Sequence, residues 1–273
     1  MYVAVALLLV CSGWFAHGWY LRDQGVLKHR LVKASGFRYT SPLLDVEFPE
    51  GLKVNREPIP FKYKIKELVQ RQIHGGKAQK VSVYYRDLQD GPWFGINLKQ
   101  EFDPASMMKV PVMIAWLKRA EKDPHVLKQT FVYDGSKDLV AQQSIKPVRS
   151  IRPGGSYSVD ELLRYMLNYS DNNATSLLFN KLKTEELNDV MDGMDVANNP
   201  RNDTNSISVH GYSGFFRILY NASYLNREMS EKALQLLSLQ DFPQGISAGV
   251  PAGTIVASKF GERVAHVGHG ARL

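Results

Sequence analysis

Apolar and polar residues follow two different periods in the first third of this 273-residue chain, and these periods predict a helix followed by a β-hairpin. Residues 61–76, FKYKIKELVQRQIHGG, place apolar side chains at helical spacing and end in two glycines. Residues 80–99, KVSVYYRDLQDGPWFGINLK, alternate apolar and polar positions on both sides of an Asp-Gly-Pro turn. That alternation is typical of two paired strands.

Most apolar residues after position 100 follow helical spacing. Residues 102–120, FDPASMMKVPVMIAWLKRA, predict a buried helix with Ser106 near its start. Ser158 is followed three residues later by Glu161, which predicts a capped helix start. Further helices are predicted at residues 173–182, 184–194, 211–225 and 230–239, and a final strand at residues 253–267. Strands at both ends of a helical middle predict an α+β domain over residues 61–273 with an inserted helical subdomain.

The first 20 residues contain no Asp, Glu, Lys or Arg, and residues 2–10 are continuously apolar. Aromatic residues follow at about the depth of a membrane interface, at positions 14, 15, 19 and 20. We interpret residues 1–21 as a membrane anchor, with a cleaved signal peptide or a lipoprotein signal at Cys11 as alternatives. Residues 22–60, which are polar and punctuated by prolines, are expected to form a tether. The rest of the protein is then expected outside the cytoplasm, although the basic residues after the span fit that orientation poorly.

The composition excludes several classes of protein. A hydrophobic content of 44% suffices for a sizeable core, and the single cysteine excludes an internal disulfide framework. The net charge is +7, but basic residues are scattered among acidic ones, which argues against nucleic-acid binding. His266 and His269 lack the acidic partners and the helical spacing of a zinc motif. We expect no metal and no cofactor, and we also expect a monomer.

Three short polar motifs carry the candidate chemistry. Ser106 and Lys109 are three residues apart, so they share one face of a helix, where a buried neutral amine could take the serine proton. Residues 169–175, YSDNNAT, place Ser-Asp-Asn between two predicted helices, and residues 258–261, SKFG, lie in the predicted last strand. Taken alone, each motif also fits an ordinary structural role, namely a common spacing, a helix cap or a surface lysine.

The three motifs together and in this order resemble the S-x-x-K, S-D-N and K-T-G set of class A β-lactamases and penicillin-binding serine hydrolases, over about residues 61–261. The resemblance implies a β-lactamase/transpeptidase-like fold, with an antiparallel sheet flanked by helices. It also implies that Ser106 forms an acyl-enzyme, that Lys109 takes the serine proton, and that Ser170 passes a proton to the leaving nitrogen.

The same resemblance implies a set of substrate-binding residues, namely Asn172, Lys259, Gly261 and Glu262. Asn172 would bind the substrate amide, and Lys259 would attract the substrate carboxylate. Gly261 would leave room for the acyl group. The backbone N–H groups of Ser106 and Glu262 would form the oxyanion hole.

The chain departs from the family pattern in three places. Phe260 replaces the threonine of K-T-G, so a hydroxyl that helps to hold the substrate carboxylate is missing. The loop glutamate that drives deacylation in class A enzymes has no clear counterpart, because Glu185 and its neighbours are expected on a helix, which leaves Asp195 and Asp203 as the acidic residues of the loop. Only twelve residues follow Gly261, so the C-terminal strands and helix of the family are expected to be missing.

Three functions remain open at this point. The leading hypothesis is a β-lactamase that opens β-lactam rings through Ser106. A D-alanyl-D-alanine peptidase that acts on peptidoglycan stem peptides and deacylates slowly is the first alternative. A non-catalytic module that binds cell-wall peptide or β-lactam is the second.

Overall fold

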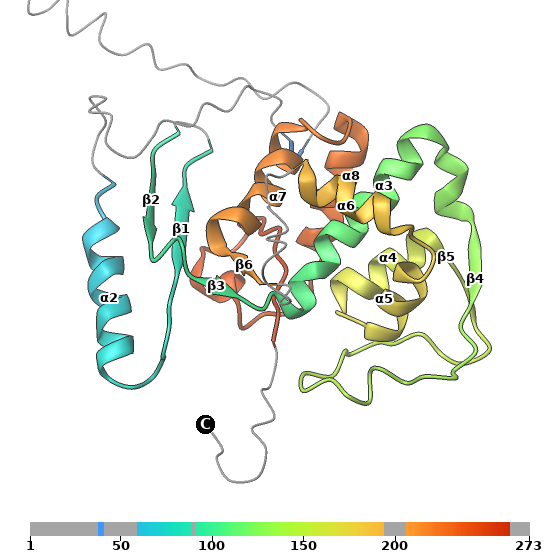
Figure 1. Ribbon diagram of the computed structural model, residues 1–273, viewed down its shortest axis with the longest axis horizontal. Coiled ribbons are helices and arrows are strands. Elements are labelled where there is room, and N and C mark those ends of the chain that lie inside the picture. The colour runs from blue at the N-terminus through green and yellow to red at the C-terminus, as the bar shows by residue number, and fades with distance from the viewer. Residues whose placement is uncertain (1–37, 41–58, 89–90, 194–205, 263–273) are drawn as a thin grey trace, which may run out of the picture. The chain divides into compact units, whose positions relative to one another are not determined.

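The computed structural model describes residues 38–40, 59–88, 91–193 and 206–262 (Figure 1). The predicted anchor at residues 1–21, most of the predicted tether and the last eleven residues lie outside the described residues. Within the described ranges, no helix has both the length and the apolar character needed to cross a membrane.

The first described elements are the predicted helix and hairpin. Helix α2 (Lys62–His74) ends where the Gly75 N–H binds the Arg71 carbonyl and the following glycine takes a positive φ. Strands β1 (Val83–Arg86) and β2 (Trp93–Ile96) pair antiparallel. Both predictions are therefore confirmed.

Helix α3 (Lys109–Lys122) is the central element of the core. The 3₁₀ helix η1 (Ala105–Met108) leads into it, and Figure 1 shows α3 among the helices of the middle of the chain. Its apolar side chains are almost fully buried, and the Trp116 indole N–H donates to the Leu178 carbonyl at 3.3 Å. Each such side chain contributes about 1.5–3 kcal/mol on burial, which fixes the position of α3.

Three further helices surround this core. They are α4 (Val159–Asn168), α5 (Asn172–Phe179) and α6 (Thr184–Asp192), and each of them packs against α3. The predicted cap is confirmed, because the Ser158 hydroxyl accepts from the Glu161 N–H at 3.2 Å and the Glu161 carboxylate accepts from the Ser158 N–H at 2.8 Å.

The last two helices begin earlier in the chain than the sequence predicts. Helix α7 (Val209–Asn221) starts where the Ser208 hydroxyl accepts from the Gly211 N–H, and it ends at Ala222, whose φ is +50°. Helix α8 (Arg227–Ser238) starts where Asn226 accepts from the Met229 N–H. A polar capping residue precedes the apolar residues of a helix. A prediction from apolar periodicity alone therefore places the start of the helix too late.

The strands form three separate antiparallel pairs within the described residues. Besides β1 and β2, strand β3 (Glu101–Phe102) pairs with β6 (Ile207–Ser208), and β4 (Thr130–Val132) pairs with β5 (Ser156–Ser158). The short 3₁₀ helices η2 (Pro124–Lys128) and η3 (Ile246–Gly249) complete the described elements. The predicted α+β class is confirmed.

The prediction of a strand at residues 253–267 is wrong for its described part, residues 253–262, which pair with no described strand. A strand requires a neighbouring backbone that continues the hydrogen-bond ladder. Here the segment lies against a helix, because the Ser258 N–H donates to the Leu237 carbonyl of α8 at 3.1 Å.

Residues 38–40 of the predicted tether are attached to α8 by one carboxylate. Glu231 accepts the backbone N–H groups of Arg38, Tyr39 and Thr40, at 2.8 and 3.0 Å from Tyr39 and 2.9 Å from Thr40. Thr40 is fully buried, and Tyr39 packs against the core.

The capping box of α4 can be tested directly. We expect Ser158→Ala to lower the free energy of unfolding by about 1 kcal/mol, because an N–H of the first turn loses its acceptor. Urea denaturation measures the change. Ser156→Ala is the matched control, because Ser156 is exposed on the same strand and should change stability by less than about 0.5 kcal/mol. Equal losses in both variants would contradict the assignment.

Candidate active site

Ser106 lies at the point where a strained turn enters the core helix. Ala105, directly before it, has a φ of +46°, a conformation that non-glycine residues seldom adopt. The Asp103 carboxylate accepts the Ala105 N–H at 2.9 Å, and the Pro104 carbonyl accepts the Met107 N–H at 2.9 Å. Strain held in this way by surrounding bonds often marks a functional site.

Lys109 brings the Ser106 and Ser-Asp-Asn motifs together. Its Nζ lies 3.0 Å from Ser106 Oγ, 2.8 Å from the Ser170 carbonyl, 3.0 Å from Ser170 Oγ and 2.7 Å from Asn172 Oδ1. Only 3% of the Lys109 surface is exposed. An ammonium has three N–H groups for these four oxygens, whereas a neutral amine has a lone pair that can accept the Ser106 proton.

Burial lowers the pKa of Lys109 to about 8, against an opposing effect of the nearby Asp171 carboxylate. The sequence predicts a buried neutral amine at this position. The pKa of Lys259 is also lowered, to about 7, mainly by burial and to a lesser extent by repulsion from the charge of Lys109. Near pH 8, a substantial fraction of both lysines is therefore in the neutral amine form.

Ser170 bridges the two lysines. Its Oγ lies 3.0 Å from the Nζ of Lys109 and 3.0 Å from the Nζ of Lys259. Its φ is +58°, so this residue also sits in the left-handed region. A hydroxyl that accepts from amines can still donate its own proton, and this arrangement suits a proton relay.

Lys259 reaches Ser170 from the C-terminal segment. It is 6% exposed, and its Nζ also donates to the Phe260 carbonyl at 3.0 Å and lies 4.1 Å from the centre of the Phe260 ring. Phe242 stacks on the same ring with the centres 4.0 Å apart. The aromatic residue that replaces the threonine of the family pattern thus packs beside the ammonium group.

Asp171 organises the turn that carries Ser170. Its fully buried carboxylate accepts the N–H groups of Asn173 and Ala174 at 2.7 and 3.1 Å, and so caps α5. The other oxygen accepts from Ser150 Oγ and from the Ile151 N–H, both at 2.9 Å. The capping role follows from the position of Asp171 before a helix, whereas the two distant partners carry no signal in the sequence.

Gly261 packs against the backbone beside the nucleophile. A Cβ added to Gly261 would lie 2.4 Å from the Pro104 carbonyl oxygen and 2.9 Å from Met107 Cγ. A side chain at this position would therefore displace η1. Glu262 is exposed and is the last residue described in this region, and the role of its N–H in an oxyanion hole stays a prediction.

Two residues that contact the site were missed from the sequence. Tyr212 on α7 is buried and donates its hydroxyl to the Met107 carbonyl at 3.1 Å, and burial raises its pKa so that the hydroxyl keeps its proton. Gln143, between β4 and β5, contacts the backbone of the turn at Ser170. Helical spacing could place Tyr212 in the core, but no pattern indicated either hydrogen bond.

Other sequence candidates lie apart from the site or outside the described residues. Glu186, next to Glu185, pairs on α6 with the Arg119 guanidinium, as expected for a helical residue outside the site. Asp195 and Asp203 lie outside the described residues. The tail histidines at positions 266 and 269 do so as well.

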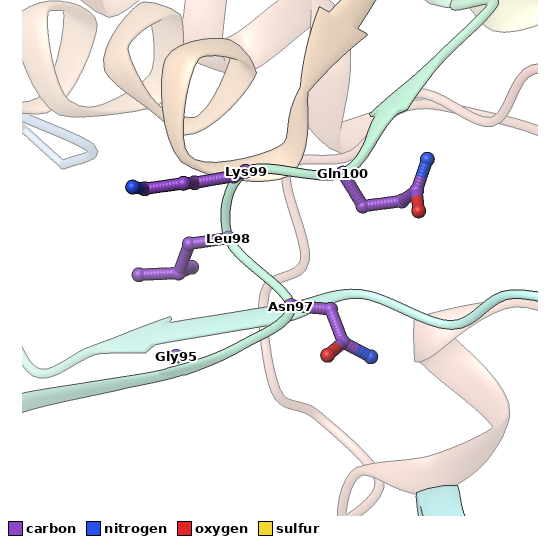
Figure 2. Close-up of a pocket in the computed structure, with 5 residues that line it drawn as sticks. All are labelled: Gly95, Asn97, Leu98, Lys99 and Gln100. Carbon is purple, nitrogen blue, oxygen red and sulfur yellow. The ribbon is translucent and has the colours of Figure 1, made fainter.

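A hollow at the end of β2 lies apart from these residues. It is lined by Gly95 and by residues 97–100 (Figure 2). Figure 2 shows the side chains of Leu98 and Lys99 pointing away from those of Asn97 and Gln100. Because a single short stretch of chain forms this hollow and none of the three motifs contributes to it, we assign it no role.

The lowered pKa of Lys259 predicts how the stability of the protein depends on pH. Between about pH 7 and 10, the folded protein binds fewer protons at Lys259 than the unfolded chain, so stability rises with pH across this window. We expect Lys259→Met to raise the free energy of unfolding near pH 6 by on the order of 1–4 kcal/mol, a gain that disappears near pH 10. Urea denaturation at the two pH values measures it, with the exposed Lys128→Met as the control. A loss of stability at the lower pH would contradict the prediction.

Comparison with known families gives a match over most of the chain. The model of the β-lactamase enzyme family matches residues 60–269, which include all three motifs. No curated protein sequence is similar enough to be counted as a relative.

Solved structures share the fold at low identity. A class A β-lactamase from Mycobacterium abscessus matches with 22% identity and a TM-score of 0.60, covering 72% of this chain and 78% of its own. PBP-A matches with 20% identity and a TM-score of 0.61, covering 76% and 78%. A β-lactamase from Sphaerobacter thermophilus DSM 20745 matches with 21% identity and a TM-score of 0.54, covering 63% and 68%. The chain therefore belongs to the β-lactamase enzyme family and is a serine hydrolase.

Proposed function

We propose that this protein opens β-lactam rings by forming an acyl-enzyme on Ser106. The observation that carries the proposal is the 3.0 Å contact between Ser106 Oγ and Lys109 Nζ, an amine whose pKa burial lowers to about 8. A weak hydroxyl nucleophile needs a base of this kind within hydrogen-bond reach, and few structural roles call for a buried lysine.

The contacts support a sequence of proton transfers in which charge balances. Neutral Lys109 takes the Ser106 proton as Oγ attacks the lactam carbonyl, so a C–O bond forms and the lysine becomes an ammonium. Ser170 Oγ, in contact with Lys109, gives its proton to the lactam nitrogen as the C–N bond breaks, and Lys109 returns a proton to Ser170. The acyl-enzyme and a neutral Lys109 remain.

The remaining site residues are proposed to bind the substrate. Asn172 already contacts Lys109 through Oδ1, which leaves its Nδ2 to donate to an amide carbonyl. Lys259 is proposed to attract the substrate carboxylate. The N–H groups of Ser106 and Glu262 are proposed to hold the oxyanion, and Gly261 lets the segment approach the nucleophile.

Deacylation separates the leading proposal from its first alternative. On α6, Glu186 pairs with Arg119 and Glu185 is exposed, and the sequence from residue 194 to residue 205 contains no glutamate. Loss of a general base typically slows a step by about 10²–10⁴-fold. This supports a D-alanyl-D-alanine peptidase acting on peptidoglycan stem peptides, with slow deacylation, as the second candidate, unless Asp195 or Asp203 acts as the base.

We further propose that the protein acts outside the cytoplasm, tethered by residues 1–21. The support is the charge-free apolar start of the sequence. Membrane fractionation followed by a carbonate wash would test the tether, because a cleaved or soluble protein leaves the membrane pellet.

Intact mass against time after mixing with a penicillin tests the function. We expect an adduct of one penicillin on Ser106 that is absent from Ser106→Ala. An adduct that clears within seconds supports β-lactam hydrolysis, and one that lasts for hours supports the peptidase. Ser156→Ala, which changes an exposed serine on β5, should keep the adduct. A folded wild-type protein that gains no mass, but still binds the penicillin as tightly as Ser106→Ala does, would favour the non-catalytic module.

The acylation rate should depend on pH through Lys109. Because the neutral amine is the base, the rate is expected to rise as pH increases and to level off above about pH 8. Stopped-flow or quenched mass spectrometry across this range measures the rate. A rate that falls on passing from about pH 6 to pH 8 would rule out Lys109 as the base.

A further inference from the structure

Gln143 is the one side chain from outside the three motifs that contacts the backbone on both sides of Asp171 within the described residues. It lies in the irregular segment between β4 and β5 and is half-buried. Its Nε2 donates to the Ser170 carbonyl at 3.0 Å, and its Oε1 accepts the Asn172 N–H at 3.1 Å. One planar amide thus spans the turn between α4 and α5.

The turn has two features that require such a partner. Ser170 has a φ of +58°, which costs on the order of 1–2 kcal/mol and persists only where surrounding contacts hold it. Asn172 is the first residue of α5, where backbone N–H groups lack a partner within the helix. Asp171 caps the N–H groups of Asn173 and Ala174. The Gln143 side chain accepts the N–H group of Asn172.

The same carbonyl connects Gln143 to the candidate base. The Ser170 carbonyl accepts from Gln143 Nε2 at 3.0 Å and from Lys109 Nζ at 2.8 Å, which uses both of its lone pairs. The turn also carries Ser170 Oγ and Asn172 Oδ1, the two other oxygens that Lys109 contacts there. A shift of the turn would therefore change three contacts of Lys109 at once.

We propose that Gln143 is a positioning residue that holds this turn against Lys109 and keeps the lysine in its reactive, readily neutralised state. Its amide draws electron density from the Ser170 carbonyl, so this carbonyl stabilises the Lys109 ammonium less, and its side chain helps to exclude water. Its role in acylation rests on the function proposed above, whereas its effect on the ionisation of Lys109 does not.

The charged groups around Lys109 fix the sign of the expected effect. Asp171 in the turn favours the ammonium, and Lys259 from the C-terminal segment lies across Ser170 Oγ from Lys109. In the segment of Gln143, Lys146 donates to backbone carbonyls and Asp138 accepts from Asn173. Loss of the Gln143 donor frees the Ser170 carbonyl for the ammonium and admits water beside it, so the pKa of Lys109 should rise.

The first test is a titration of Lys109 by NMR, with lysine labelled at Cε and the signal identified by its loss in Lys109→Met. We expect Gln143→Ala to raise the midpoint by about half a unit or more, and Gln143→Glu, which keeps an acceptor for the Asn172 N–H but adds a carboxylate, to raise it further. Gln142→Ala is the matched control, because Gln142 is the exposed neighbour. It should leave the midpoint unchanged.

The second test is the pH profile of acylation by a penicillin in the same variants. Gln143→Ala should move the rising limb to higher pH and lower the rate at neutral pH by about three- to tenfold. Thermal melts identify any variant that fails to fold, and Gln143→Ala retains the test if Gln143→Glu does not fold. Midpoints equal to the wild type in folded Gln143 variants would overturn the proposal. A shifted midpoint in a protein that no penicillin acylates would support the role of Gln143 and overturn the proposed function.

Discussion

The burial of one amine is the constraint on which the rest of the site depends. Lys109 begins the most deeply buried helix of the described fold, where an unpaired charge would be costly. Oxygens from Ser106, Ser170 and Asn172 surround it and lower that cost. Those oxygens come from a strained turn on each side, so the core helices, the cap at Asp171 and the close approach of Gly261 all serve to hold them in place.

The second lysine makes the site a coupled system. Lys109 and Lys259 share one hydroxyl of Ser170, and both have lowered pKa values, of about 8 and about 7. Near neutral pH the titrations of the two lysines are coupled, because a proton on one lysine disfavours a proton on the other. Such an arrangement can hold a mobile proton between the attacking and the leaving atoms. Acyl transfer requires this of a site in which no histidine contacts Lys109 or Ser106 among the described residues.

What could be predicted from the sequence was local. The contact between Ser106 and Lys109 follows from their spacing on a helix. The Ser158 cap follows from the position of Glu161, and the hairpin follows from its alternating apolar residues and its turn. The two hydrogen bonds of Gln143 to the turn could not be predicted, because an irregular segment has no periodic pattern that indicates which way a side chain points. The final strand failed for a related reason, since a strand exists only through a partner that the strand's own residues do not specify.

The attachment of residues 38–40 to α8 bears on how the folded unit carries mechanical load. Three consecutive N–H groups share the Glu231 carboxylate, so tension along the chain from the side of residue 1 reaches α8 before it reaches α2. Helix α8 packs against α3 and α4, which makes its core-facing side the anchor point for that force. A pull on the chain before residue 38 would therefore reach α8 and the helices it packs against before it reaches the hairpin.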